Sequence, residues 1–139
     1  MSVAIQANGD IIAAGATNNY TDFITARYLV GPQIGSFTAN PSPVTAGSSV
    51  TLTASSIADG VPSSTITQVA LYLDSNNDGT LEPGNDTLLG YATQTSPGVW
   101  TLTNSSAFGL TKGTYTLFGQ AQDSDGIFGD PIALTLTVQ

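Results

Sequence analysis

Short runs in which apolar and polar residues alternate, separated by Gly, Pro, Asn and Asp, constrain the fold of this chain most strongly. In residues 49–55, for example, Val50, Leu52 and Ala54 alternate with Thr and Ser. Such period-two alternation places successive side chains on opposite faces of a β-strand. No window keeps the 3.6-residue spacing of an amphipathic helix, and Thr, Gly and Asn recur at intervals that weaken helices. We therefore predict an all-β fold.

Residues 33–139 contain about seven such runs, which predict an immunoglobulin-like β-sandwich. The predicted strands are 33–39, 49–55, 65–74, 87–93, 99–103, 113–121 and 131–138. The run 65–74 carries apolar residues on both faces, which indicates a central strand. Pro41 and Pro43 interrupt the pattern, and a sheet tolerates them only at an edge or a corner.

Three further runs, 3–6, 11–16 and 22–30, precede the predicted sandwich. The first two are joined by a turn containing Asn-Gly, a strong hairpin signal. Gly31-Pro32 ends the pattern, so we predict a hairpin or three-strand unit at 1–31 and the sandwich at 32–139. The apolar residues of the first unit need a partner, which is either the sandwich of the same chain or another copy.

The charge composition excludes several classes of function. The 139 residues include ten acids, two basic residues, no His and no Cys, for a net charge of −8. Catalysis by Ser-His-Asp or Cys-His and zinc binding by imidazole or thiolate are therefore excluded. Two cations cannot neutralise a nucleic-acid backbone, and no apolar run approaches the length of a membrane span. Paired carboxylates could hydrolyse a glycoside only in a cleft with aromatic platforms, but the acids fall on predicted turns, so we expect no enzyme.

The segment from Asp74 to Asp86 has the residue pattern of a calcium loop. Oxygen-bearing side chains at positions 1, 3 and 5, followed by Gly79 at position 6, begin a loop of the EF-hand type. The candidate ligands are Asp74, Asn76, Asp78, the carbonyl of Thr80, Glu82 and Asp86. No helices flank the loop, and position 12 is Asn85 instead of a bidentate acid, which departs from EF-hand geometry. The alternative is a solvated turn, because Asn, Asp and Gly are also turn residues.

A divalent cation would remove the electrostatic repulsion within this loop. Four carboxylates lie within thirteen residues with no Lys or Arg nearby, so we expect Ca²⁺ as the cofactor. The other cluster, Asp123, Asp125 and Asp130, falls between the last two predicted strands, and we interpret it as a turn. Strands 65–73 and 113–121 are expected to be antiparallel, which places Asp59 at the end of this cluster and the 74–86 loop at the opposite end.

Aromatic residues suggest both core positions and a glycan surface. Trp100 and Phe118 lie in alternating runs and are expected in the core. Tyr115, at the start of the penultimate strand, is expected to bond back to the preceding corner, as in immunoglobulin-like sandwiches. The aromatic residues near turns, which could stack on sugars if they formed a contiguous strip, are Tyr20, Tyr91, Phe108 and Phe128.

The two basic residues have structural interpretations. Lys112 lies in a turn beside Gly113, so we expect no intramolecular isopeptide bond. Arg27 lies in an apolar run and is expected to pair with Asp22 or Asp10.

Two stretches of the chain resemble known protein families. The stretch GTYTL at 113–117, continuing through AQDSDG at 121–126 to PIALTLTV at 131–138, resembles the last two strands of bacterial Ig-like surface modules of the adhesin type. That resemblance covers residues 33–139. QANGDIIAAG at 6–15 with DFITARY at 22–28 resembles one unit of the propeller-like delta-60 repeat, although Leu-Val-Gly-Pro replaces the usual turn after it.

These features and resemblances imply a non-catalytic, calcium-stabilised structural or adhesion module of a larger extracellular or cell-surface bacterial assembly. Its expected partners are neighbouring modules or copies of itself. One alternative is a filament subunit joined by strand complementation through residues 3–30. Another is a carbohydrate-binding module with a glycan partner. Met1-Ser2 precedes neither a basic nor a long apolar stretch, so an exported protein would contain this chain as an internal or processed piece.

Overall fold

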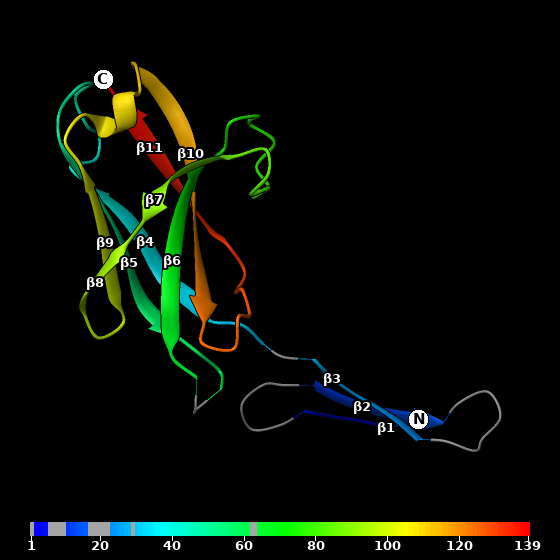
Figure 1. Cartoon of the computed structure of the whole chain (residues 1–139). Coiled ribbons are helices and arrows are strands. Elements are labelled where there is room, and N and C mark those ends of the chain that lie inside the picture. Colours follow the sequence, from blue (N-terminus) through cyan, green and yellow to red (C-terminus); the bar gives the residue numbers. More distant parts are fainter. Residues whose placement is uncertain (1, 6–10, 17–22, 29, 62–63) are drawn as a thin grey trace.

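A computed structural model of the chain describes residues 2–5, 11–16, 23–28, 30–61 and 64–139 (Figure 1). These residues form three antiparallel sheets and one short 3-10 turn, η1 (Ala107–Gly109), so the all-β prediction is confirmed. The strands are β1 (Ser2–Ile5), β2 (Ile11–Ala16), β3 (Phe23–Tyr28), β4 (Gln33–Asn40), β5 (Val50–Ala58), β6 (Ile66–Leu73), β7 (Thr87–Tyr91), β8 (Thr93–Ser96), β9 (Val99–Asn104), β10 (Gly113–Asp123) and β11 (Ile132–Val138). No helix in the described residues is long and apolar enough to cross a membrane.

The strands β4 to β11 form the predicted immunoglobulin-like sandwich. One sheet has the order β11-β10-β6-β7 and the other the order β4-β5-β9-β8. This division into two sheets is the one expected of the fold. The additional strand is β7, which lies beside the central strand β6 of the first sheet. β6 lies between β10 and β7, as its two apolar faces predicted.

The sandwich has eight strands, one more than predicted. The prediction of a single strand at 87–93 is wrong, because two strands begin within this range. β7 pairs with β6 in one sheet, whereas β8 pairs with β9 in the other. Ala92 lies buried between them, and its N–H donates to the carbonyl of Val69 at 2.9 Å. Hydrophobic alternation continues through such a crossing, so it could not reveal that the chain changes sheets.

The two prolines lie at a corner, as predicted. β4 pairs with β5 as far as Asn40, and the peptide bonds preceding Pro41 and Pro43 are cis. After them, Val44 forms a parallel bridge with Val138 of β11 in the opposite sheet. The prolines therefore occupy the point where the chain passes from one sheet to the other.

The core lies between the inner faces of the two sheets. Val50, Leu52 and Ala54 of β5 are fully buried, as their alternation predicted. Trp100 belongs to the same core. Phe118 is also buried, but it lies on the outer face of its sheet because its neighbour Leu117 points into the core. Phe118 is therefore buried, as expected, but the expectation that it packs in the core between the sheets is wrong.

The predicted tyrosine corner is present at the start of β10. The hydroxyl of Tyr115 donates to the backbone carbonyl of Thr111 at 2.9 Å. The same side chain packs against the core. It therefore ties the connection before β10 to the sandwich.

β1, β2 and β3 form a separate sheet with β2 at its centre, and Figure 1 shows this sheet extending away from the sandwich. The connecting residues Gly31 and Pro32 are buried against the β10–β11 loop. A Cβ atom built on Gly129 would overlap the carbonyl oxygen of Pro32. The connection therefore has room only for glycine at position 129.

Candidate metal centre

The β6–β7 loop, residues 74–86, projects from one end of the sandwich (Figure 1). Asp74 follows β6 directly, and its N–H donates to the carbonyl of Thr116 in β10 at 3.0 Å. Asp86 directly precedes β7. Both side chains are buried, with 4% and 7% of their surface exposed. The two acids at the ends of the loop are thus part of the folded sandwich.

Each of these two carboxylates uses both of its oxygens to accept backbone N–H groups of the loop. Asp74 accepts from Asp78 at 3.3 Å and from Gly79 at 3.0 Å. Asp86 accepts from Ser75 at 3.1 Å and from Glu82 at 2.8 Å. These bonds compensate the desolvation of two buried charges and set the path of the loop. Gly79 has a φ of 78°, which allows the predicted reversal of the chain.

Asn76 and Asp78, which are exposed, and Glu82, which is half-buried, form a second group, which we call the outer group. The amide nitrogen Nδ2 of Asn76 donates to Asp78 Oδ2 at 2.8 Å and to Glu82 Oε2 at 3.1 Å. Asn85 donates to the same oxygen of Glu82 at 2.9 Å. Thr80, the remaining predicted ligand, donates its N–H to Asp78 Oδ1 at 2.8 Å. Two carboxylates of the loop therefore meet at one amide nitrogen.

The structure thus brings the six predicted ligands into one loop but divides them by role. Asp74 and Asp86 support the backbone, whereas the outer group faces solvent. In the described residues, no set of three or more acidic side chains is arranged to hold a metal ion. A cation site here would therefore need amide and carbonyl oxygens in addition to carboxylates, and Ca²⁺ accepts all three kinds of ligand.

The N–H groups of the loop also reduce the electrostatic repulsion between its carboxylates. The sequence contains four carboxylates here without a nearby basic residue, but the folded loop supplies backbone and amide N–H donors to them. Sequence reasoning could not include them, because which N–H faces which carboxylate depends on the folded path of the loop.

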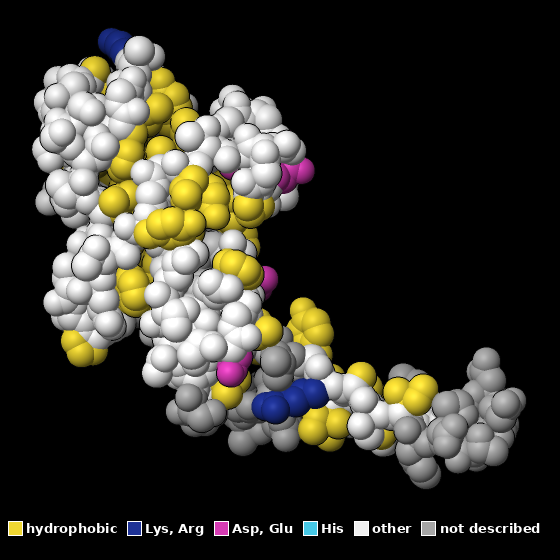
Figure 2. All heavy atoms as spheres, in the orientation of Figure 1, with side chains coloured by type: hydrophobic (Ala, Val, Ile, Leu, Met, Phe, Trp, Pro, Cys, Tyr) yellow, Lys and Arg dark blue, Asp and Glu magenta, His cyan; other side chains and the backbone are white. Residues whose placement is uncertain are grey.

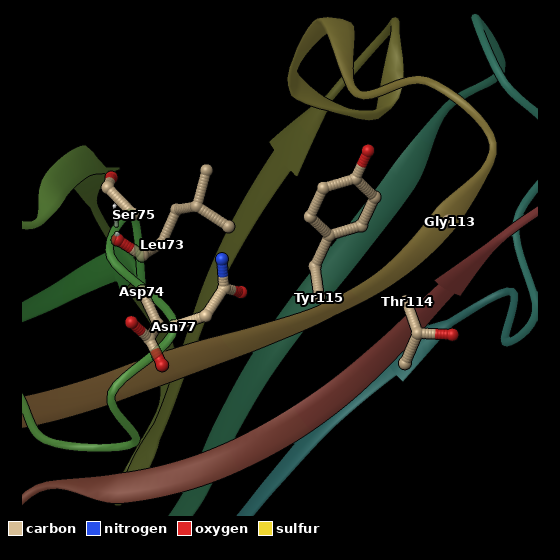
Figure 3. A pocket seen from close by; sticks show the side chains of 7 residues that line it. All are labelled: Leu73, Asp74, Ser75, Asn77, Gly113, Thr114 and Tyr115. Atoms are coloured by element: carbon tan, nitrogen blue, oxygen red, sulfur yellow. Dashed lines mark hydrogen bonds between the residues drawn. The ribbon is translucent and has the colours of Figure 1, made fainter.

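A hollow of about 460 Å³ separates the start of this loop from β10 (Figure 3). It is lined by Leu73, Asp74, Ser75, Asn77, Gly113, Thr114 and Tyr115. Sequence reasoning did not identify this hollow, because its two sides are almost forty residues apart and meet only through the pairing of β6 with β10.

The Asp123 cluster behaves as a turn. Asp123 is buried, and its Oδ1 accepts the N–H groups of Asp125 at 2.9 Å and Ile127 at 2.8 Å. Asp125 and Asp130 are exposed. The adjoining Ser124 lies 3.2 Å from Ser64, hydroxyl to hydroxyl, which brings the β5–β6 connection containing Asp59 to this end of the sandwich, as expected.

The aromatic residues predicted near turns do not form one strip in the described part of the chain. Tyr91 and Phe128 are 54% and 52% exposed but belong to separate regions, and Phe108 packs against the core. Tyr20 lies outside the described residues. The prediction for Arg27 also stays open, because Asp10 and Asp22 lie outside the described residues, and Lys112 is exposed in its turn.

A different aromatic group lies on the outer face of the first sheet. The strand registers align Leu88, Tyr72, Phe118 and Ala133 across β7, β6, β10 and β11. Tyr91 lies opposite Ala70, one step along the same face. Burial raises the pKa of Tyr72, and the nearby Tyr91 phenolate raises it further. We call Tyr72, Tyr91, Leu88 and Phe118 the aromatic row, and Figure 2 shows hydrophobic side chains gathered over β6 and β7.

Comparisons with known proteins show the fold. No protein-family model matches the chain, and no curated protein matches its sequence. Among solved structures, it is similar to the fibronectin(III)-like modules of Clostridium thermocellum CbhA, with 14% identity and a TM-score of 0.56. That match covers 94% of this chain but 61% of the other, so this chain spans less than two thirds of it.

A second similar structure is superoxide reductase (neelaredoxin) from Ignicoccus hospitalis, with 15% identity, a TM-score of 0.51, and coverage of 78% of this chain and 83% of that one. No sequence match supports the resemblances to adhesin modules or to the delta-60 repeat. At these identities the similarity extends to the architecture alone, and it agrees with the Ig-like sandwich formed by β4 to β11.

Proposed function

We propose that this chain is a non-catalytic structural module of a larger extracellular bacterial protein, and that Ca²⁺ orders its β6–β7 loop. The observation that carries the calcium proposal is the meeting of Asp78 and Glu82 at the single amide nitrogen of Asn76. Two carboxylates at one point require a positive or hydrogen-bond-donating group between them.

A cation could take the place of that amide nitrogen after one local change. Rotation of the Asn76 amide by half a turn replaces Nδ2 with Oδ1, so that three side-chain oxygens face the same point. The rotation breaks the 3.3 Å bond that Oδ1 accepts from the N–H of Asp78, and this N–H keeps its 3.3 Å bond to Asp74. Ca²⁺ binds such oxygens together with backbone carbonyls and water. Asp74 and Asp86 would keep the loop in place, because their bonds to backbone N–H groups do not depend on Asn76.

The non-catalytic part of the proposal is supported by the chain's chemistry and its fold. The sequence contains no His or Cys. The carboxylates of the β6–β7 loop already accept hydrogen bonds from the loop itself. The fold is that of a fibronectin(III)-like module. An extracellular location is supported by composition alone, since the chain is rich in Thr and Ser and poor in charged residues.

The calcium proposal is tested by thermal unfolding of the whole chain in EDTA and in a calcium titration. At 100 times its dissociation constant, a ligand that binds only the folded state stabilises it by about 2.7 kcal/mol. We expect Asp78→Asn to abolish this calcium response with little change of the Tm in EDTA. Asp125→Asn is the matched control, because it removes one exposed charge from the other cluster and should keep the response.

An unfolding transition that is identical in EDTA and in saturating calcium would overturn the calcium proposal. A response to calcium that survives in Asp78→Asn would place the ion elsewhere in the chain.

Glycan binding at the aromatic row is the second candidate function. Tyr72 and Tyr91 lie on the outer face of a sheet, and Tyr91 is 54% exposed. Aromatic rings on such a face can stack on sugars while their hydroxyl groups bond to them. We expect a glycan array to give a signal that Tyr91→Ala removes and that Phe128→Ala, which removes an equally exposed ring elsewhere, retains. An array with no signal, or equal losses in the two variants, would exclude it.

A further inference from the structure

One face of the N-terminal sheet is entirely apolar in the described residues. Residues that are partners in an antiparallel register point to the same face. The register of β1, β2 and β3 therefore places Val3, Ile5, Ile11, Ala13, Gly15, Ile24, Ala26 and Tyr28 together, and we call this surface the apolar face. Among the side chains that the structure describes, every large hydrophobic residue exposed in this sheet belongs to the apolar face, and Ile5 and Tyr28 are 75% and 70% exposed. Figure 2 shows hydrophobic side chains exposed along this sheet.

The apolar face has a raised end and a hollowed end. Ile5, Ile11 and Tyr28 are register partners and form a row of large side chains across the three strands, which we call the ridge. Toward the other end, small residues leave a hollow of about 250 Å³, lined by Ala13, Ala14, Gly15, Ala16, Ile24 and Ala26. A Cβ atom built on Gly15 would meet nothing within 4 Å, so this hollow is open.

Most charged residues that the structure describes lie in the sandwich, and one of them, Asp130, lines a hollow together with Tyr28 of the apolar face. All acids except Asp10 and Asp22 fall between residues 59 and 130, in the sandwich. Arg27 is the charged residue within β1, β2 and β3. Its register partner is Ile12, which places Arg27 on the face opposite the apolar face. The net charge of −8 therefore opposes close approach of two sandwiches more than approach of two N-terminal sheets.

We propose that the apolar face binds the same face of a second copy of this chain, with the ridge of each copy in the hollow of the other. A two-fold axis between the sheets satisfies this arrangement, because one surface then supplies both the large side chains and the space that receives them. The product is a six-stranded sandwich with its sheets about 10 Å apart. Because the contact is closed, it yields a dimer, whereas strand complementation at the outer strands β1 and β3 would yield a filament.

This inference does not depend on the calcium proposal. The apolar face and the β6–β7 loop share no residues, so each can fail without the other. Measuring the oligomeric state in EDTA, and the calcium response of the monomeric variant, keeps the two outcomes apart.

The test is sedimentation equilibrium of the whole chain across a wide concentration range. We expect a monomer–dimer equilibrium in the unmodified chain. Ala13→Glu places a charge on the apolar face and should weaken dimerisation at least tenfold. Ala14→Glu is the matched control: this neighbouring residue of β2 has a similar partial exposure, and the register points its side chain to the opposite face, so that only its backbone borders the hollow.

A second variant guards against loss of the sheet itself. Gly15→Val fills the hollow with a residue that favours strands, and the single chain has room for it. It should therefore weaken dimerisation while keeping the β-sheet signal in circular dichroism. A chain that remains monomeric at the highest concentration overturns the proposal, as do equal effects of Ala13→Glu and Ala14→Glu or growth into filaments.

Discussion

Asp86→Asn is expected to lower the free energy of unfolding by about 2–3 kcal/mol in the absence of calcium. The Asp86 carboxylate is buried, and its two oxygens accept the N–H groups of Ser75 at 3.1 Å and Glu82 at 2.8 Å. Asparagine retains one acceptor oxygen, so in either orientation its NH₂ group faces one of these N–H groups. The variant therefore loses one charge-assisted hydrogen bond and leaves a partly buried N–H group without an acceptor.

The magnitude follows from those two bonds. A hydrogen bond to a charged group contributes about 1.5–3 kcal/mol, and that loss includes the penalty for the stranded donor when the site is buried. The bond that remains is weakened, because its acceptor is now neutral. Both effects act on the loop that joins β6 to β7, and the inner faces of these strands meet the core.

Urea unfolding in EDTA, followed by tryptophan fluorescence, measures this loss. Trp100 is the single tryptophan of the chain and is buried in the core, so its emission reports unfolding of the sandwich. The matched control is Asp125→Asn, at an exposed acid, which should unfold within about 0.5 kcal/mol of the unmodified chain. If the two variants unfolded at the same urea concentration, the Asp86 carboxylate would not hold the loop, and our assignment of its role would be refuted.

Three further predictions concern other parts of the sandwich. Gly129→Ala should lower the free energy of unfolding by about 1–3 kcal/mol or displace the connection at Pro32. Calorimetry measures this loss, and the control is Gly84→Ala, whose added methyl group meets nothing within 4 Å. Tyr115→Phe removes the 2.9 Å bond to the carbonyl four residues upstream and should cost about 1 kcal/mol in urea unfolding, whereas an unchanged midpoint would contradict the corner's role. Because the pKa of Tyr72 is raised above 10.0 in the folded state, its contribution to stability is complete below pH 10 and is lost as the pH rises through the folded pKa. Ultraviolet absorbance should place its ionisation above pH 10, and Tyr72→Phe should remove that part of the titration.

The strands of the sandwich could be predicted because their signal is local. In β5, three apolar residues alternate with hydroxyl residues, and the structure buries all three completely. The tyrosine corner was predictable for the same reason, since Tyr115 and its acceptor are four residues apart. The alternation does not report which sheet a strand joins, and for that reason the passage from β7 to β8 was missed.

The roles of the acids in the β6–β7 loop could be predicted only in part. Their spacing identified one loop rich in oxygen ligands, and the structure brings all six residues into it. Spacing could not separate Asp74 and Asp86 from the others, because the burial of these two depends on their position beside β10 and β7. The outer group likewise depends on the orientation of one amide, which no pattern of residues specifies.

Local patterning thus determined that this chain forms strands, where its turns lie and where its carboxylates gather, because each of these properties depends on residues close together in sequence. Tertiary structure alone decided which residues share a face. Phe118 joined Tyr72 on the outside of the sandwich through a pairing between strands 46 residues apart. The apolar face of the N-terminal sheet likewise required the register of three strands. Such juxtapositions come from the pairing of distant segments, which the period of a single strand does not encode.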